Sequence, residues 1–141
     1  MDQKKREELL KEAIEARKNA YVPYSHFMVG AALLAKDGRI YRGCNIENAA
    51  FGSTMCGERT AFFKAVSEGQ REFEAIAIVG GPEGGNLLPV CDPCGNCRQV
   101  MAEFCKGDFE IIFGSCEDDI SVYTLEQLLP LRFDYDEAMK A

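Results

Sequence analysis

The stretch 56-CGERTA-61, with its counterpart 93-PCGNCRQ-99, lies at the centre of this sequence. Together the two stretches hold three thiols and one carboxylate, with no histidine near them. Three protein ligands are typical of a catalytic zinc site, because such a site leaves its fourth coordination position open to water. The pattern therefore predicts a zinc site with an open position.

The spacing of the two stretches gives each side chain a distinct chemical role. Cys56, Cys94 and Cys97 are the candidate zinc ligands, and each lies where a predicted helix begins. A helix N-terminus stabilises anions and so lowers the pKa of a thiol, which favours the thiolate that binds zinc. Glu58 lies two residues after Cys56, where its carboxylate can reach the open face of the metal and move protons to and from water.

The charge of such a site requires a cation nearby. Three thiolates outweigh one Zn²⁺, and the surplus negative charge weakens the ability of the metal to acidify water. Arg59 and Arg98 can both donate hydrogen bonds to ligand sulfurs and so offset this charge. Of the two, we favour Arg59.

A fourth cysteine allows a different interpretation of the same pattern. Cys91 stands three residues before Cys94, so Cys56, Cys91, Cys94 and Cys97 could together form a closed structural zinc site or half of an iron–sulfur site. A closed site has no use for Glu58 beside the metal. The presence of Glu58 therefore favours the interpretation as an open, catalytic zinc site.

Length and composition predict a single domain that spans residues 1–141. Hydrophobic residues make up 47% of the chain and charged residues 28%, and no apolar run is long enough to span a bilayer. The charged start of the chain lacks the apolar core of a signal peptide, and the seven cysteines are an odd number for a disulfide framework. We therefore expect a cytoplasmic protein without a membrane partner.

The acidity of the chain bears on its ligand. The formal net charge is -7, whereas nucleic-acid binding draws most of its affinity from lysine and arginine at phosphates. A neutral small molecule is the more plausible ligand, and nucleic acid is not expected as a partner.

Hydrophobic periodicity predicts the order α-β-β-α-β-α-β-β-α. We expect helices over 2–20, 56–68, 94–105 and 124–130, and strands over 27–35, 39–44, 73–79, 110–114 and 120–123. Asp37-Gly38 is a strong hairpin signal, so the first two strands should pair antiparallel. Because helices separate later strands, we expect parallel pairing after this hairpin, and thus an α/β fold with a mixed sheet covered by helices on both faces.

Polar side chains follow the second predicted strand. Asn45 and Glu47 stand at its end, where polar residues are well placed to hold a ligand. Asn and acidic side chains at such positions also make turns, so both interpretations stay open.

Several linked motifs resemble those of the short, homotetrameric cytidine deaminases. The motifs are 23-PYSHF-27 with 29-VGAA-32, 43-GCNIENA-49, 58-ERTA-61, 64-KAVSEG-69 and 93-PCG-x-CRQ-99. The similarity runs over nearly the whole chain. It implies a three-layer α/β/α sandwich around a five-stranded mixed sheet, a zinc cofactor and a homotetramer. It also implies hydrolytic deamination of cytidine and deoxycytidine to uridine and deoxyuridine with release of ammonia, as in pyrimidine salvage.

The resemblance assigns roles at the metal. Cys56, Cys94 and Cys97 match the zinc ligands, and Arg59 matches the arginine that neutralises ligand sulfurs. Glu58 matches the residue that takes a proton from water, protonates the ring nitrogen and delivers a proton to the departing ammonia.

It also assigns roles at the nucleoside. Asn45 and Glu47 match the residues that hold the ribose 3′-hydroxyl, and Phe27 matches an aromatic side chain that packs against the pyrimidine. The amide of Gly57 matches a donor to the base carbonyl. Phe133 resembles a tail aromatic residue that closes the pocket of a neighbouring subunit.

Some positions depart from the family pattern. Gly57 stands where alanine is usual, Phe51 where tyrosine is common and Asn96 where a small residue is expected. The 80–92 loop with its extra Cys91 also differs. These departures bear on substrate preference more than on the reaction.

Two alternative functions remain at this point. One is deamination of a modified cytosine nucleoside such as blasticidin S, which needs the same zinc chemistry. The other is a non-catalytic, zinc-stabilised binding module. Such a module would keep the cysteines but has no need of Glu58, Asn45 and Phe27 together, and all three are present.

Overall fold

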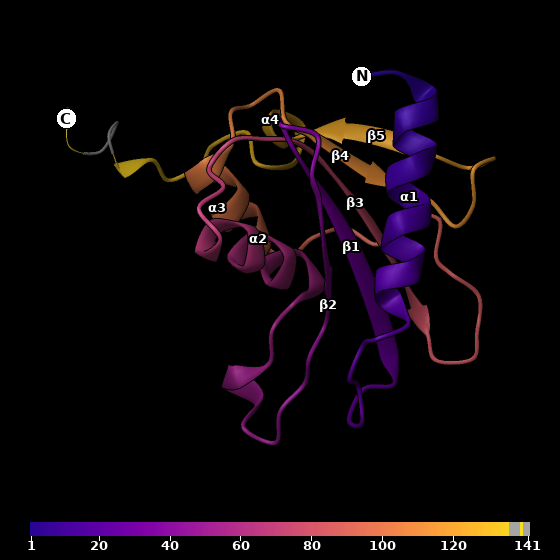
Figure 1. The fold of residues 1–141 in the computed structure, drawn as a ribbon. Coiled ribbons are helices and arrows are strands. Elements are labelled where there is room, and N and C mark those ends of the chain that lie inside the picture. The colour runs from indigo at the N-terminus through magenta and orange to yellow at the C-terminus, as the bar shows by residue number, and fades with distance from the viewer. Residues whose placement is uncertain (136–138, 140–141) are drawn as a thin grey trace.

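The structure is a computed structural model that describes residues 1–135 and Met139. Its elements are, in chain order, α1 (Gln3–Arg17), β1 (Phe27–Ala35), β2 (Ile40–Cys44), the 3₁₀ helix η1 (Phe51–Ser53), α2 (Gly57–Ser67), β3 (Phe73–Pro82), α3 (Gly95–Phe104), β4 (Glu110–Phe113), β5 (Ser121–Thr124) and α4 (Leu125–Leu128). Apart from η1, this is the predicted order (Figure 1). Within the described residues, no helix combines the length and apolar character needed to cross a membrane.

The five strands form one mixed sheet in the order β2-β1-β3-β4-β5. The predicted hairpin is confirmed, because β1 and β2 pair antiparallel. Parallel pairing after the hairpin is correct for β3 and β4, but wrong for β3 with β1 and for β4 with β5, which are antiparallel. Helix α2 connects β2 to β3, and these two strands do run parallel to each other. However, β1 lies between these two strands, so β3 pairs with a strand of opposite direction.

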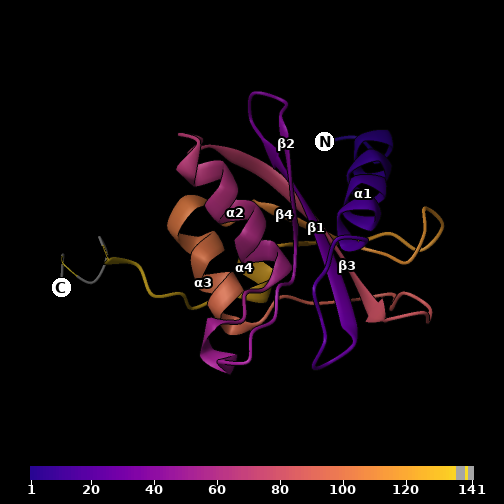
Figure 2. The same ribbon diagram turned by 60° about the horizontal axis from the view of Figure 1, so that its bottom comes forward.

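Helices cover both faces of the sheet, as the three-layer prediction requires. Helix α1 packs on one face, while α2, α3 and α4 lie on the other (Figures 1 and 2). Alternate residues of β1 point to opposite faces, as the strand period of two demands: Leu33 joins the cluster under α2 and α3, and Leu34 joins the cluster under α1. The sheet is therefore buried on both sides.

Gly30 marks the point where α1 comes closest to β1. A Cβ atom at this position would lie 2.1 Å from the carbonyl oxygen of Ala13 and 2.5 Å from the amide nitrogen of Arg17. Both contacts are helix backbone, so α1 would have to move away from the sheet. We expect Gly30→Ala to lower the free energy of unfolding by about 3 kcal/mol, the upper range for overpacking a core. Denaturant unfolding measures this loss.

The matched control for this prediction is Gly52→Ala. A Cβ atom at Gly52 would have no neighbour within 4 Å, so this variant should unfold at nearly the wild-type denaturant concentration. Equal stability of the two variants would contradict close packing of α1 on the sheet at Gly30.

Candidate metal centre

Two helix N-termini bring the three candidate zinc ligands together. Cys56 is the N-cap of α2 and Cys94 is the N-cap of α3, while Cys97 lies in the first turn of α3. The two helices pack against each other on the same face of the sheet, so their first turns meet (Figure 2). The three Sγ atoms lie within 4.8 Å of one another. The sequence prediction that these separate positions converge is therefore confirmed.

The spacing of the sulfur atoms fits zinc. The Sγ atoms of Cys56 and Cys94 are 3.9 Å apart, and those of Cys94 and Cys97 are 3.6 Å apart. Tetrahedral zinc with bonds of about 2.3 Å to sulfur spaces two ligands by about 3.8 Å. The donor set thus fits a zinc ion held by three thiolates.

Arg59 supplies the cation that the cluster requires. Its Nη2 atom donates to Sγ of Cys56 at 3.3 Å. A hydrogen bond from Cys97 and the guanidinium of Arg59 lower the pKa of Cys56 to about 5, so this sulfur is a thiolate at neutral pH. By contrast, Arg98 binds carbonyl oxygens, including that of Pro93 at 2.9 Å. The contacts thus favour Arg59 over Arg98 as the residue that offsets the sulfur charge.

We expect Arg59→Met to weaken zinc binding by about 10- to 100-fold, because it removes a donor to a ligand sulfur. Competition between the protein and a chromophoric chelator measures the affinity. Arg39→Met is the matched control, since Arg39 lies in the β1–β2 hairpin and pairs with Asp37 at the surface. Equal zinc affinity in the two variants would contradict the role of Arg59.

Glu58 is the buried acidic group beside the cluster. It lies in the first turn of α2, and only 5% of its surface is exposed. Burial disfavours the charged form and raises the pKa of Glu58 to about 7. A carboxyl group in this range can both accept and donate protons near neutral pH.

Cys91 does not join the metal cluster. Among the described residues, the group that could hold a metal consists of Cys56, Cys94 and Cys97. The Sγ atom of Cys91 instead packs against Gly80 near the end of β3, 2.4 Å from where a Cβ atom of that glycine would lie. Burial raises the pKa of Cys91 to about 12, so this thiol stays protonated. This geometry argues against the closed four-cysteine site.

Asn45 links the end of β2 to the start of β1. Its Oδ1 atom accepts from the amide of Val29 at 2.9 Å, and its Nδ2 atom donates to the carbonyl oxygen of Phe27 at 2.8 Å. Each of these two atoms can make a second hydrogen bond. Asn45 therefore orders the backbone at Phe27 and still retains one donor and one acceptor for a ligand.

Glu47 binds the segment before β1. Its Oε1 atom accepts from the amides of Tyr24 and Ser25, each at 3.0 Å, and its Oε2 atom accepts from the hydroxyl of Ser25. The hydrogen bond from Ser25 lowers the pKa of Glu47, so the carboxylate is ionised at neutral pH. No sequence pattern predicts a role for Ser25 beyond its place in the motif 23-PYSHF-27.

The polar residues after β2 lie beside the metal centre. Ile46 and Met55 exchange two backbone hydrogen bonds, at 2.9 and 3.0 Å, which brings the 45–47 segment next to Cys56. Gly57, the first residue of α2, is buried against the backbone of Cys44. The structure therefore places the predicted nucleoside contacts of the 45–47 segment and Gly57 at the same end of the sheet as the cysteines.

Phe133 stands apart from this arrangement. Its side chain is 67% exposed, while its carbonyl oxygen accepts from Nε2 of Gln99 on α3 at 2.9 Å. The backbone of the tail is thus attached to α3, and the ring is mostly exposed to solvent.

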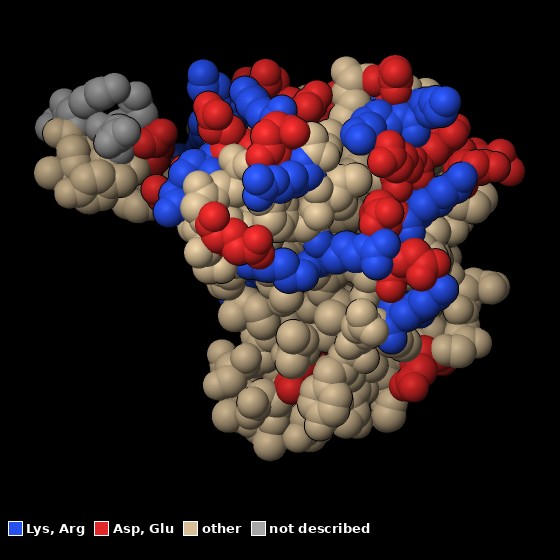
Figure 3. Space-filling view, viewed as in Figure 1, with Lys and Arg blue, Asp and Glu red and all other residues tan. Residues whose placement is uncertain are grey.

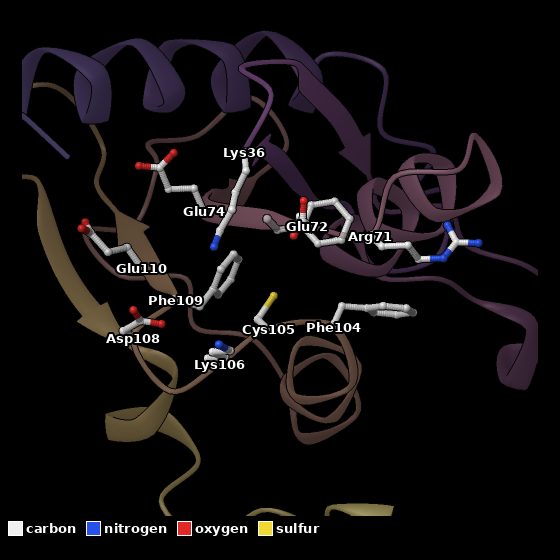
Figure 4. A pocket seen from close by; sticks show the side chains of 11 residues that line it. Lys36, Arg71, Glu72, Glu74, Phe104, Cys105, Lys106, Asp108, Phe109 and Glu110 are labelled. Atoms are coloured by element: carbon white, nitrogen blue, oxygen red, sulfur yellow. The ribbon is translucent and has the colours of Figure 1, made fainter.

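A cavity of about 730 Å³ lies at the opposite end of α3 (Figure 4). It is lined by charged residues of both signs, such as Lys36, Lys106, Glu74 and Asp108, around the ring of Phe109. Because α3 has ten residues, this cavity lies about 15 Å from the cysteine cluster along the helix. It contains none of the predicted site residues.

The fold and the cluster together define an α/β protein with a candidate zinc site and a buried carboxylate beside its three cysteines. Comparisons with known proteins narrow this class. Residues 3–114 match the family described as the cytidine and deoxycytidylate deaminase zinc-binding region. The chain belongs to this family.

Relatives of known activity agree with this assignment. The chain is 54% identical to the cytidine deaminase of Sporosarcina psychrophila, over 93% of each chain. It is 33% identical to the blasticidin-S deaminase of Bacillus cereus, over 89% of this chain and 90% of that one. The crystal structure of the cytidine deaminase from Burkholderia pseudomallei superposes with a TM-score of 0.79, at 45% identity, and covers 89% of this chain and 97% of that one.

Proposed function

We propose that this protein catalyses the hydrolytic deamination of cytidine and deoxycytidine to uridine and deoxyuridine, with release of ammonia, as a step of pyrimidine salvage. One observation carries the proposal: a buried glutamate lies in the first turn of a helix whose N-cap is a member of a three-cysteine cluster. The cytidine deaminases that share 54% of its sequence support the same substrate class.

Cys56, Cys94 and Cys97 would hold the zinc ion, since their sulfur spacing fits tetrahedral coordination. Zinc, when bound, supplies a Lewis acid that lowers the pKa of water. Arg59 draws charge from Cys56 and so limits the loss of Lewis acidity that three thiolates cause.

Glu58 is the proton carrier of the reaction. It takes a proton from the attacking water, delivers it to the ring nitrogen next to carbon four, and passes a proton to the departing amino group. Its burial, at 5% exposure, keeps these transfers away from bulk solvent, and its pKa of about 7 suits both directions of transfer.

Four groups would hold the nucleoside. Phe27 packs against the base, and the amide of Gly57 donates to the base carbonyl, because the first amides of a helix have no acceptor within it. Asn45 and Glu47 bind the 3′-hydroxyl of the sugar. The unused donor of Asn45 and the remaining lone pair of Glu47 are complementary to a hydroxyl group, which both accepts and donates.

The chain would act as a homotetramer in which Phe133 of one subunit closes the pocket of another. Exposed apolar side chains near the proposed site support an interface; they are Tyr21, Tyr24, Ile46 and Phe51. On the face of the molecule that Figure 3 shows, charged residues gather over the upper part. The lower part, where the segments between α1 and β1 and between β2 and α2 lie, carries few of them. Light scattering in solution tests the assembly, and a monomer at micromolar concentration would contradict it.

Charge and thiol chemistry support the cellular setting. The net charge of -7 favours a neutral nucleoside over nucleic acid as ligand. The seven cysteines are all free thiols, which supports a reducing compartment, and we assign the protein to the cytoplasm. Both apolar clusters include strands of one sheet, which supports a single domain over residues 1–141.

Blasticidin S is the alternative substrate, because the chain is also similar to the blasticidin-S deaminase of Bacillus cereus. Ultraviolet absorbance of cytidine, deoxycytidine and blasticidin S, each mixed with zinc-loaded protein, separates the alternatives. We expect rapid loss of the cytidine and deoxycytidine bands and at least tenfold slower loss of the blasticidin band. Preferential turnover of blasticidin S would overturn the proposed substrate. No turnover of any of the three by fully zinc-loaded protein would favour a binding module.

A further inference from the structure

Ser25 connects three groups that the proposed function places around the nucleoside. Its hydroxyl donates to Oε2 of Glu47. The Oγ atom of Ser25 also accepts a hydrogen bond from the amide of Phe27 at 3.0 Å. The carbonyl oxygen of Phe27 in turn accepts from Nδ2 of Asn45 at 2.8 Å. An uninterrupted chain of hydrogen bonds thus runs from Glu47 through Ser25 and Phe27 to Asn45.

Hydrogen-bond capacity shows what Ser25 does to Glu47. A carboxylate has about four lone-pair sites. The amides of Tyr24 and Ser25 fill both sites of Oε1, and the hydroxyl of Ser25 fills one site of Oε2. A single acceptor site therefore remains, and the Ser25 hydroxyl fixes the direction in which that site points.

The backbone around Ser25 has an unusual conformation. His26 has a φ of 59°, which lies in the left-handed region that non-glycine residues rarely adopt. Hydrogen bonds on both sides hold this turn, because the amide of His26 donates to the carbonyl oxygen of Val22 at 3.0 Å and the amide of Phe27 donates to Ser25. Loss of the Ser25 hydroxyl removes one of these restraints next to Phe27.

We propose that Ser25 is a positioning residue for nucleoside binding: it orients the free lone pair of Glu47 toward the 3′-hydroxyl of the sugar and holds the backbone of Phe27 in register with it. Ser25 acts through Glu47 and has no part in proton transfer. This inference rests on the proposed function, because it concerns the nucleoside site of the same enzyme.

The test compares two substrates that differ by one hydroxyl. Ser25→Ala should raise KM for cytidine by about tenfold, the effect of losing a hydrogen bond to a charged group, with kcat changed less than twofold. With 3′-deoxycytidine, the rise in KM should be much smaller than with cytidine, because the hydroxyl that Glu47 binds is missing and only the restraint on the backbone of Phe27 is lost. Ser25→Thr retains the hydroxyl and should restore KM for cytidine to within about threefold of wild type.

Ser67→Ala is the matched control. Ser67 lies at the far end of α2 from the cysteines, and its hydroxyl donates to the carbonyl oxygen of Lys64. This variant should leave KM unchanged for both substrates. An equal rise in KM for cytidine and 3′-deoxycytidine in Ser25→Ala would overturn the proposal, since a general loosening of the loop does not distinguish the two. An unchanged KM for cytidine would overturn it as well.

A second measurement does not depend on turnover. Carbon NMR titration of the Glu47 carboxyl in the zinc-loaded protein should give a pKa below the ordinary range for glutamate in the wild type and a higher pKa in Ser25→Ala. If the wild type failed to deaminate cytidine, the proposed function would fail, while this titration would still decide whether Ser25 controls Glu47. The same pKa in wild type and variant would refute the link.

Discussion

Glu58→Gln should retain zinc and the fold but lower kcat for cytidine by about 10²- to 10⁴-fold, the usual contribution of a general acid–base group. Glutamine has nearly the same shape as glutamate, so the packing of the first turn of α2 should persist. Its amide cannot exchange protons with water or with the ring. Because Glu58 is 95% buried, bulk solvent has little access to replace the missing carboxyl group.

Steady-state kinetics, combined with metal analysis of the same samples, measures this effect. Glu68→Gln is the matched control, since Glu68 is exposed at the C-terminal end of the same helix. The control should keep wild-type kcat and zinc content. A zinc-loaded Glu58→Gln enzyme with wild-type kcat would show that another group carries the proton.

Cys97→Ala should lose both zinc and activity. Cys97 is 1% exposed and lies 3.6 Å from the sulfur of Cys94, so it is the most enclosed of the three candidate ligands. Two remaining thiolates cannot complete the three-ligand set of a catalytic zinc site. We expect zinc to fall from about one per chain to less than about a tenth after dialysis against a chelator.

Metal analysis of dialysed protein tests this prediction together with two other cysteine variants. Cys116→Ala should retain zinc because Cys116 is exposed and lies outside the cluster. Cys91→Ala should also retain zinc, although Cys91 precedes the cluster at metal-like spacing. Zinc loss in Cys91→Ala would restore the closed four-cysteine interpretation, and full zinc in Cys97→Ala would refute the ligand set.

Local sequence patterns contained much of the fold and the metal centre. The strand expected over 27–35 has these bounds in the structure, and the two helices that carry the cysteines begin within one residue of the predicted positions. Cys56 and Cys94 could be placed near helix starts because apolar residues at helical spacing follow each of them, from Ala61 and from Val100. That placement alone makes three sulfurs converge once the two helices pack side by side.

Contacts distant in sequence could not be derived in this way. Periodicity gives the faces of β3 but not its neighbour, so its antiparallel pairing with β1 was missed. The link between Ser25 and Glu47 joins residues 22 positions apart, and no local pattern encodes it. Asn45 and Glu47 could be assigned either to turns or to a ligand. In the structure both side chains hold the backbone before or within β1 and still retain hydrogen-bonding capacity.

Hydrolytic deamination replaces the amino group of cytidine with oxygen from water. Zinc-loaded protein should be mixed with cytidine in water enriched in the heavy isotope of oxygen, and the products analysed by mass spectrometry and an ammonia assay. We predict uridine that carries one solvent oxygen, formed together with an equal amount of ammonia. Cytidine that stays intact beside a full complement of zinc, or uridine without solvent oxygen, would contradict hydrolytic deamination.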